Sequence, residues 1–166
     1  MKNILAPIDL SEVSLAVMER ASCFGQSLAS NLWLLHVVPL PNHSNPFNLD
    51  RNLWRQEVAR GLRDRRRQLH ALAEQLRRER NHVFARFIAG TVNTVILAEA
   101  ERIHADLIIM GSHGHGNVYH ALFGGAGQKV MRKAPCPVML VQPLASKSHW
   151  HQVQQGAETK HETYSQ

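Results

Sequence analysis

Residues 107–130 read LIIMGSHGHGNVYHALFGGAGQKV. The apolar residues at the start predict a short buried strand, and the glycine-rich run behind them predicts a turn. A helix is then expected from Gly125 to Lys133. A strand, a glycine-rich turn and a helix in this order present free backbone N–H groups to an anion. The stretch therefore predicts a phosphate-binding loop within an α/β fold.

The glycine spacing excludes two common phosphate loops. A Walker A loop requires Lys and then Ser or Thr after its last glycine. Here Gly116 is followed by Asn117 and Val118. A dinucleotide fingerprint requires G-x-G-x-x-G and is expected early in the chain. The spacing of Gly111, Gly114 and Gly124 is instead G-x-x-G, nine residues, G. Neither standard loop applies.

Strand-like and helix-like segments alternate along the rest of the chain. Continuous apolar runs predict buried strands, and apolar residues at helical spacing predict helices. The predicted strands are 4–8, 32–38, 83–88, 107–110 and 138–141, and the predicted helices are 12–29, 52–80, 93–103 and 125–133. This alternation predicts right-handed βαβ units, and hence an α/β domain with a single open, mostly parallel five-stranded sheet and helices on both faces. Such sheets bind ligands at the carboxyl ends of their strands.

Composition fits one globular domain. The chain has 166 residues, of which 44% are hydrophobic. We expect the domain to span residues 1–144 and the polar segment 145–166 to be a disordered tail. No apolar run approaches the ~18 residues of a membrane span, and the first residues, MKNILAPIDLSE, contain no signal-peptide core. We therefore expect a cytoplasmic protein without membrane insertion. Cys23 and Cys136 lie too far apart in sequence for a C-x-x-C motif, so neither a disulfide framework nor a cysteine zinc site is expected.

The positive charge is concentrated in one segment. The formal net charge is +6, and residues 51–80 hold ten arginines against four acidic residues, while the rest of the chain holds nine basic and nine acidic residues. The segment predicts an amphipathic surface helix. Clustered arginines can attract nucleic acid or another polyanion. Because Trp54 is the only aromatic residue among them, a solvated face is favoured and nucleic acid is not the expected partner.

Four segments in order resemble the universal stress protein family. They are ILAPIDLSE, LLHVV, ADLIIMGSHGHG and FGGAGQKVMRKAPCPVMLV, and the resemblance runs from Lys2 to about Gln142. It implies a Rossmann-like fold, similar to that of the adenine nucleotide alpha hydrolases, and an adenine nucleotide ligand, ATP, with Mg²⁺ as a candidate companion ion. It further implies a regulatory or protective role in stress response and a homodimer through the last strand, Val138 to Val141. An unknown regulatory protein partner would read the nucleotide state.

The resemblance also implies a set of ligand-binding residues. Asp9, preceded by Pro7 and Ile8, would lie beside the adenosine, and Val37 would offer backbone groups to the base. The alternative role of Asp9 is to cap the following helix, for which Ser11 is the other candidate. The residues implied around the ribose and the phosphates are Met110, Gly111, Ser112, His113, Gly114, Gly124, Gly125, Ala126 and Gly127.

The chain departs from the family pattern at Gly125. ATP-binding members carry Ser or Thr at this position, and a second position that is often hydroxylated is Gly127 here. A hydroxyl that donates to a phosphate oxygen contributes about 1.5–3 kcal/mol. Its loss leaves open a second hypothesis, a member that binds no nucleotide and acts through protein partners or its basic helix. A slow ATP hydrolase is a third.

The sequence contains no motif that assigns catalytic residues. There is no nucleophile elbow G-x-S-x-G, and no paired acid and base can be identified. We therefore expect a binding protein rather than an enzyme. His113, His115 and His120 lack a nearby Cys, Asp or Glu, so a metal site is not expected. His36 lies in an apolar run, which favours an interior histidine with its hydrogen bonds satisfied.

Overall fold

The computed structural model describes residues 1–39, 51–79, 82–112 and 125–142. The elements in these ranges are β1 (Asn3–Pro7), α1 (Glu12–Ser27), β2 (Asn31–Val38), α2 (Arg51–Arg78), β3 (His82–Ala89), α3 (Val92–Arg102), β4 (Leu107–Gly111), α5 (Gly125–Lys133) and β5 (Val138–Val141). The predicted elements are confirmed in kind and order, and no end differs by more than two residues.

The strands form one parallel sheet in the order β3-β2-β1-β4-β5. From β1 the chain moves outward through β2 to β3, and it then returns to the other side of β1 for β4 and β5. The direction of winding therefore reverses between β1 and β4. In open α/β sheets, ligands bind at the carboxyl ends of the strands at such a switch point. The predicted Rossmann-like α/β fold is confirmed.

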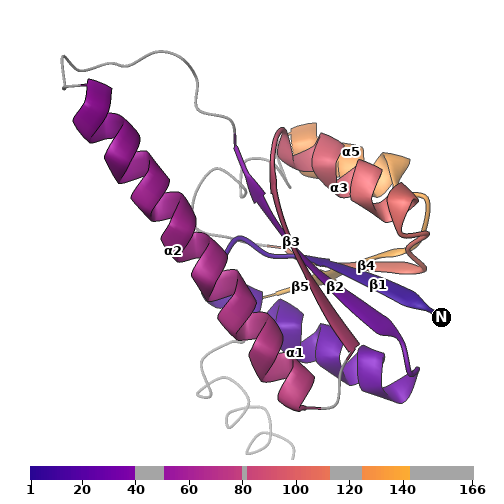
Figure 1. Ribbon diagram of the computed structural model, residues 1–166. Helices are drawn as coiled ribbons and strands as arrows, with labels where there is room; N and C mark the ends of the chain where they lie inside the picture. Colours follow the sequence, from indigo (N-terminus) through magenta and orange to yellow (C-terminus); the bar gives the residue numbers. More distant parts are fainter. Residues whose placement is uncertain (40–50, 80–81, 113–124, 143–166) are drawn as a thin grey trace, which may run out of the picture.

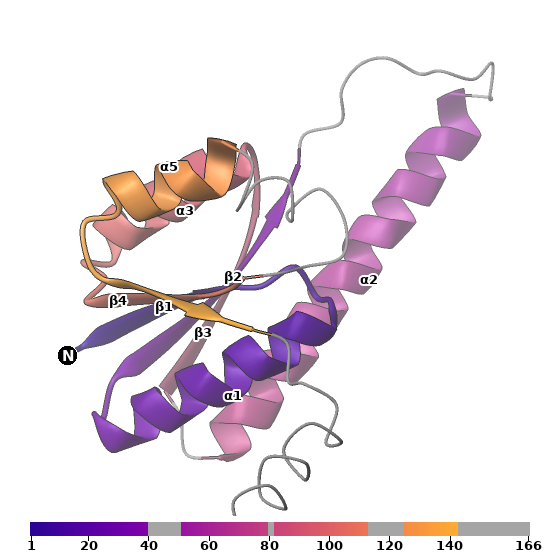
Figure 2. The same cartoon turned by 180° about the vertical axis from the view of Figure 1, so that it is seen from behind.

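Helices cover both faces of the sheet (Figures 1 and 2). Because side chains alternate along a strand, neighbouring residues of β1 enter different cores. Ile4 and Ala6 pack in the core under α1 and α2, whereas Leu5 packs in the core under α3 and α5. Central strands that are buried on both faces explain the continuous apolar runs in the sequence.

The last strand, β5, lies at one edge of the sheet, and β3 forms the other. Leu140 on β5 keeps 38% of its surface exposed. A free edge of this kind can pair with another chain, but the expected homodimer stays a prediction. The tail predicted for residues 145–166 lies outside the described residues. No helix among those the structure describes is long and apolar enough to span a membrane.

Among the side chains of α2 that the structure describes, those anchored in the core lie in the second half of the helix. Leu69, Ala73 and Leu76 are buried, whereas Val58 and Leu62 are half-buried. The first half of the helix extends past the sheet in both views (Figures 1 and 2). The predicted amphipathic surface helix is confirmed.

Candidate functional site

The two central strands separate at their carboxyl ends. The register between β1 and β4 stops at Leu5↔Ile108. β1 nevertheless stays paired with β2 up to Pro7, and β4 stays paired with β5 up to Gly111. The sheet therefore opens between β1 and β4, at the switch point.

Pro7 explains why the ladder stops there. The backbone N–H of Ile8 donates to the carbonyl of Leu35 on β2, at 2.8 Å. Successive residues of a strand direct their backbone polar groups to alternate sides, so position 7 faces β4. Proline has no N–H and cannot donate a ladder hydrogen bond. Pro7, which the family resemblance assigns to the site, thus contributes by ending the pairing of β1 with β4.

Asp9 follows β1 and uses one of its two carboxylate oxygens within the protein. Oδ1 accepts from the backbone N–H of Ser11 at 3.0 Å, from Ser11 Oγ at 2.5 Å and from Ser14 Oγ at 2.9 Å. Oδ2 is buried and has no hydrogen-bond partner among the described residues. The carboxylate is therefore held in place through Oδ1, and Oδ2 is left as an acceptor for a donor outside the described residues.

The structure places Ser11, not Asp9, at the N-cap position of α1. The side chain of Ser11, however, makes no capping hydrogen bond. Its N–H and hydroxyl donate instead to Asp9. The spacing D-x-S-x-x-S, from Asp9 to Ser14, is the sequence signal that could have indicated this anchoring.

The turn between β1 and α1 contains a strained residue. Leu10 has a φ of 66°, a left-handed conformation that costs a residue with a Cβ about 1–2 kcal/mol. Such strain persists where the surroundings fix the backbone, and it is concentrated at functional sites. The bonds made by Ile8 and Asp9 on one side of Leu10 and by Ser11 on the other fix it here.

Val37 presents its backbone to the opening. β2 continues to Val38, beyond its last register pair with β1, Pro7↔Leu35. The carbonyl of Val38 accepts from the N–H of Gly90, on the β3 side, at 2.9 Å. Because backbone groups alternate along a strand, those of Val37 point the other way, to the side on which β1 has ended. This orientation agrees with the role that the resemblance implies for Val37.

His36 was expected to be an interior histidine with its hydrogen bonds satisfied. Its burial is confirmed, but only one of its two ring nitrogens has a partner among the described residues. Its side chain is buried, and Nδ1 lies 2.9 Å from the carbonyl oxygen of Ile8. A carbonyl can only accept, so Nδ1 carries the proton and Nε2 is an acceptor. Nε2 is buried without a partner among the described residues. Burial lowers the pKa of His36 and outweighs the hydrogen bond to Ile8, which raises it; the charge of Arg65 lowers the pKa further.

The β4 side of the opening is described only in part. Met110 is buried in the core under α3 and α5. The backbone N–H of Ser112 donates to the carbonyl of Val141 at 2.7 Å, so this N–H is not available to an anion. In a parallel sheet α5 must return from the carboxyl edge, which places its first turn, Gly125 to Gly127, at that edge. His113, Gly114 and Gly124 lie outside the described residues.

Three buried side-chain atoms lack a partner among the described residues, and all three lie near the carboxyl edge. They are Asp9 Oδ2, His36 Nε2 and Asn93 Oδ1. Sequence reasoning missed Asn93, which follows β3 in the first turn of α3; only its place after a strand could have indicated it. All three atoms can accept hydrogen bonds, so this edge suits a ligand with several donor groups.

No metal cluster is present in the part of the chain that the structure describes. Three or more His, Cys, Asp or Glu side chains do not converge there. Cys23 and Cys136 are both free thiols. His115 and His120, like His113, lie outside the described residues.

Comparisons with known proteins identify the family. The model of the Universal stress protein family matches residues 1–142. A relative from Coxiella burnetii, universal stress protein A homolog 1, is 31% identical over 147 residues, which cover 84% of this chain and 95% of the relative.

Solved structures give the same result. The structure of protein MJ0577 from Methanocaldococcus jannaschii is 26% identical, has a TM-score of 0.66 and covers 87% of this chain and 98% of that chain. The structure of a universal stress protein from Archaeoglobus fulgidus in complex with dAMP has a TM-score of 0.58 and covers 85% of this chain and 98% of that chain. Its identity of 15% supports a likeness of fold alone.

Proposed function

The chain belongs to the universal stress protein family, and on this premise we propose that it binds an adenine nucleotide, ATP, at the opening between β1 and β4. The observation that carries the proposal is the buried oxygen Asp9 Oδ2, which has no partner among the described residues. A buried acceptor of this kind is stabilised by a donor that arrives with a ligand. The ribose hydroxyls and the exocyclic amine of adenosine are such donors. The complex with dAMP of a protein of the same fold supports the choice of ligand class.

Each part of the nucleotide would meet a different element. The adenosine would donate to Asp9, and the base would bind the backbone of Val37. The phosphates would lie at the start of α5, where N–H groups without helical partners and a partial positive charge favour anions. Mg²⁺ would accompany ATP through its phosphate oxygens.

The proposal extends to a binding module rather than an enzyme, one that acts as a cytoplasmic regulatory or protective protein in stress response. Asp9 is anchored by two serines and His36 by a backbone carbonyl, an arrangement that suits holding a ligand in place. The exposed edge of β5 supports a homodimer through this strand. A protein partner would then respond to the bound nucleotide.

Isothermal titration with Mg-ATP tests the binding. Protein shown to be folded by circular dichroism should give saturable heat, and Asp9→Asn should weaken it because an amide donor replaces the free acceptor. Absence of heat up to millimolar ATP in folded protein would rule out the proposal. A turnover assay with ATP should give only background release of ADP or AMP.

A member of the family that binds no nucleotide remains the second candidate because of Gly125. Gly125→Ser restores the hydroxyl at the start of α5 and should raise ATP affinity by about 10- to 100-fold, the equivalent of about 1.5–3 kcal/mol. Gly125→Ala is the matched control, since it adds a Cβ without a hydroxyl. Unchanged affinity in both variants would favour the second candidate.

A further inference from the structure

Arginine is strongly preferred over lysine around α2. Residues 51–80 contain ten arginines and no lysine, whereas the rest of the chain contains four arginines and five lysines. The two residues are nearly equal as helix formers, so solubility and helix propensity alone do not explain the choice. The planar guanidinium differs from an ammonium in binding oxyanions with two parallel hydrogen bonds. The composition of this helix therefore points to recognition of oxyanions.

Five side chains form a continuous basic surface on α2, which we call the basic flank. Its members are exposed and lie at helical spacing: Arg60, Arg63, Arg66, Arg67 and His70. With 3.6 residues per turn, they occupy about a third of the helix circumference and extend about 15 Å along its axis. The flank lies beside the stripe that contains Leu69, Ala73 and Leu76. These three residues pack in the core, and the members of the flank do not take part in that packing.

The guanidinium groups of the basic flank make few contacts with the part of the protein that the structure describes. In the described part of the chain, the flank contains one ion pair, Arg67 with Asp64 at 3.7 Å, and the Arg67 side chain is still 81% exposed. An exposed pair of this kind contributes little. Arg77 shows the contrast: its Nε and one terminal nitrogen donate to the carbonyl of Val83, at 2.9 and 2.6 Å, and fasten α2 to β3. Arginines of the flank make no such contact with the described residues.

The basic flank is also accessible to a large partner. It begins on the half of α2 that extends past the sheet (Figures 1 and 2). Among the side chains of α2 that the structure describes, the buried ones start at Leu69. A partner could therefore approach the flank without displacing another element that the structure describes.

Charge and side-chain size select the partner. A second copy would bring the same positive helix, and residues 143–166 carry two lysines and two acidic residues, so neither is complementary. The five members of the flank include no apolar side chain, although protein interfaces have an apolar core. Interfaces with nucleic acid are polar and strongly positive. Trp54 is the only aromatic residue of the segment, so the stacking platforms that bind single strands are missing.

We propose that the basic flank binds the phosphodiester backbone of double-stranded nucleic acid, independently of base sequence. Composition alone favours a solvated face. The alignment of these arginines, and their few contacts with the described residues, change that balance. Four arginines that neutralise four phosphates release about four counterions, so affinity must fall steeply with salt. The proposal does not depend on the nucleotide site.

Fluorescence anisotropy with short labelled duplexes tests the proposal. The full chain is titrated into a DNA duplex and an RNA duplex of the same sequence, from about 50 to 200 mM salt. We expect binding with a slope of log affinity against log salt of about −3 to −4 on DNA. Arg63→Gln/Arg66→Gln/Arg67→Gln should reduce the steepness by about 3 and the affinity at low salt by about tenfold or more. The two duplexes distinguish DNA from RNA as the source of the phosphates.

A matched triple variant controls for net charge. Arg20→Gln/Arg132→Gln/Lys133→Gln removes the same charge from exposed positions on α1 and α5 and should keep most of the affinity. Circular dichroism confirms folding, and Arg60→Gln/Arg63→Gln replaces the triple variant if that one does not fold. Equal loss in the flank and control variants would overturn the proposal. Absence of duplex binding, or preferential binding of polyglutamate or of anionic phosphatidylserine vesicles, would overturn it too.

Discussion

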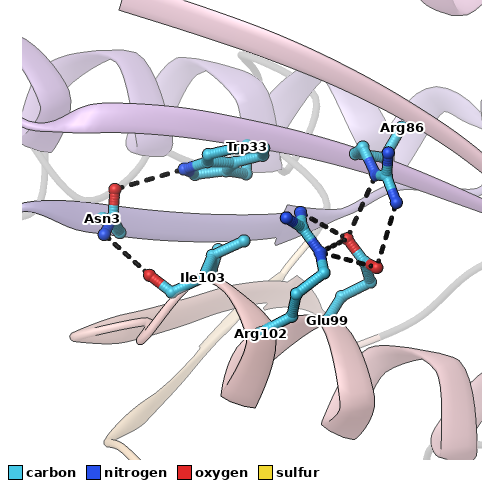
Figure 3. A network of polar contacts seen from close by, with 6 residues as sticks. All are labelled: Asn3, Trp33, Arg86, Glu99, Arg102 and Ile103. Atoms are coloured by element: carbon cyan, nitrogen blue, oxygen red, sulfur yellow. Dashed lines mark hydrogen bonds and ion pairs between the residues drawn. The ribbon is translucent and has the colours of Figure 1, made fainter.

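Two polar regions of the molecule differ in how completely their side chains are paired in hydrogen bonds and ion pairs. On the α3 face, Glu99 pairs with Arg86 at 3.2 Å and with Arg102 at 2.9 Å (Figure 3). The side chain of Asn3 in the same view donates to the carbonyl of Ile103 at 2.7 Å and accepts from Trp33 at 3.2 Å. At the carboxyl edge, by contrast, the carboxylate of Asp9 and the ring of His36 each keep one buried atom without a partner among the described residues.

The first region has its polar groups paired within the protein, whereas the second keeps buried acceptors that the proposed ligand would use. The contacts of the first region tie α3 and its end to β3 and β1, and Arg102 also lies over the ring of Trp33 on β2, 5.0 Å from its centroid. A buried acceptor without a donor instead costs about 1–3 kcal/mol. Part of this cost is recovered when a ligand supplies the donor. Substitutions in the first region should therefore change stability alone, and those in the second should change ligand affinity.

The largest effect is expected from Glu99→Ala. The variant leaves Arg86 and Arg102 without their carboxylate, and we expect it to lower the free energy of unfolding by about 2 kcal/mol. Loss of one partner from a buried pair costs about 3–5 kcal/mol, and the partial exposure of both arginines reduces this figure. Urea denaturation measures the loss. Asp64→Ala, which breaks an exposed pair, should cost less than about 0.5 kcal/mol. A change in ATP affinity of Glu99→Ala would contradict the separation of the two regions.

Asp9→Asn should give the next largest effect, on the ligand. The amide can keep an oxygen toward Ser11 and Ser14 while it replaces Oδ2 with a donor. We expect about tenfold weaker ATP binding, the equivalent of about 1.4 kcal/mol, and a change in stability below about 0.5 kcal/mol. Titration calorimetry and urea denaturation measure the two quantities. Ser14→Ala is the control, since it removes a bond to Oδ1 and leaves Oδ2 unchanged; equal affinity losses in both variants would argue against a role for Oδ2.

His36 should make stability depend on pH. Burial lowers its pKa in the folded protein, so the unfolded chain binds the proton more readily. Stability should therefore fall as the pH drops from about 6.5 toward the pKa of the folded state, with a slope of at most about 1.4 kcal/mol per pH unit. His36→Asn, whose amide can still donate to Ile8, should remove this slope. Urea denaturation across the range measures it, with His70→Asn as a control for the loss of an exposed histidine. Persistence of the slope in His36→Asn would refute this origin.

The smallest effect is expected for the contribution of Glu99 to the loss of stability in acid. Burial raises the pKa of Glu99, but the hydrogen bonds and charges of Arg102 and Arg86 outweigh it and hold the pKa below its usual value. The stabilisation is therefore present above the unfolded pKa of about 4.3 and is lost as the pH falls through the folded pKa. Thermal unfolding between about pH 5 and pH 3 should show a smaller decline in Glu99→Gln than in the original chain. Parallel declines would mean that the pair contributes no acid sensitivity.

The predictable part of the molecule is the part that local patterns encode. Apolar runs such as 32–38 lie in strands that are buried on both faces, and that requirement leaves a direct signature in sequence. The separation of β1 from β4 was not predicted, because the effect of Pro7 depends on which neighbour faces it. The acceptor Nε2 of His36 was missed for a similar reason: the ring is fixed by the hydrogen bond from Nδ1, which joins β2 to the turn after β1.

The sequence by itself determined the order of strands and helices, the family, the concentration of charge in one helix and the position of Asp9 behind a strand. These follow from residue spacing, since periodicity and turn residues act within a few positions of the chain. Only the tertiary structure decided that one oxygen of Asp9 has no partner among the described residues, that Val37 faces the place where β1 ends, and that four arginines of α2 lie on one exposed flank. Hydrogen bonds and exposure depend on which distant segments meet, and that is fixed by packing rather than by any single stretch of sequence.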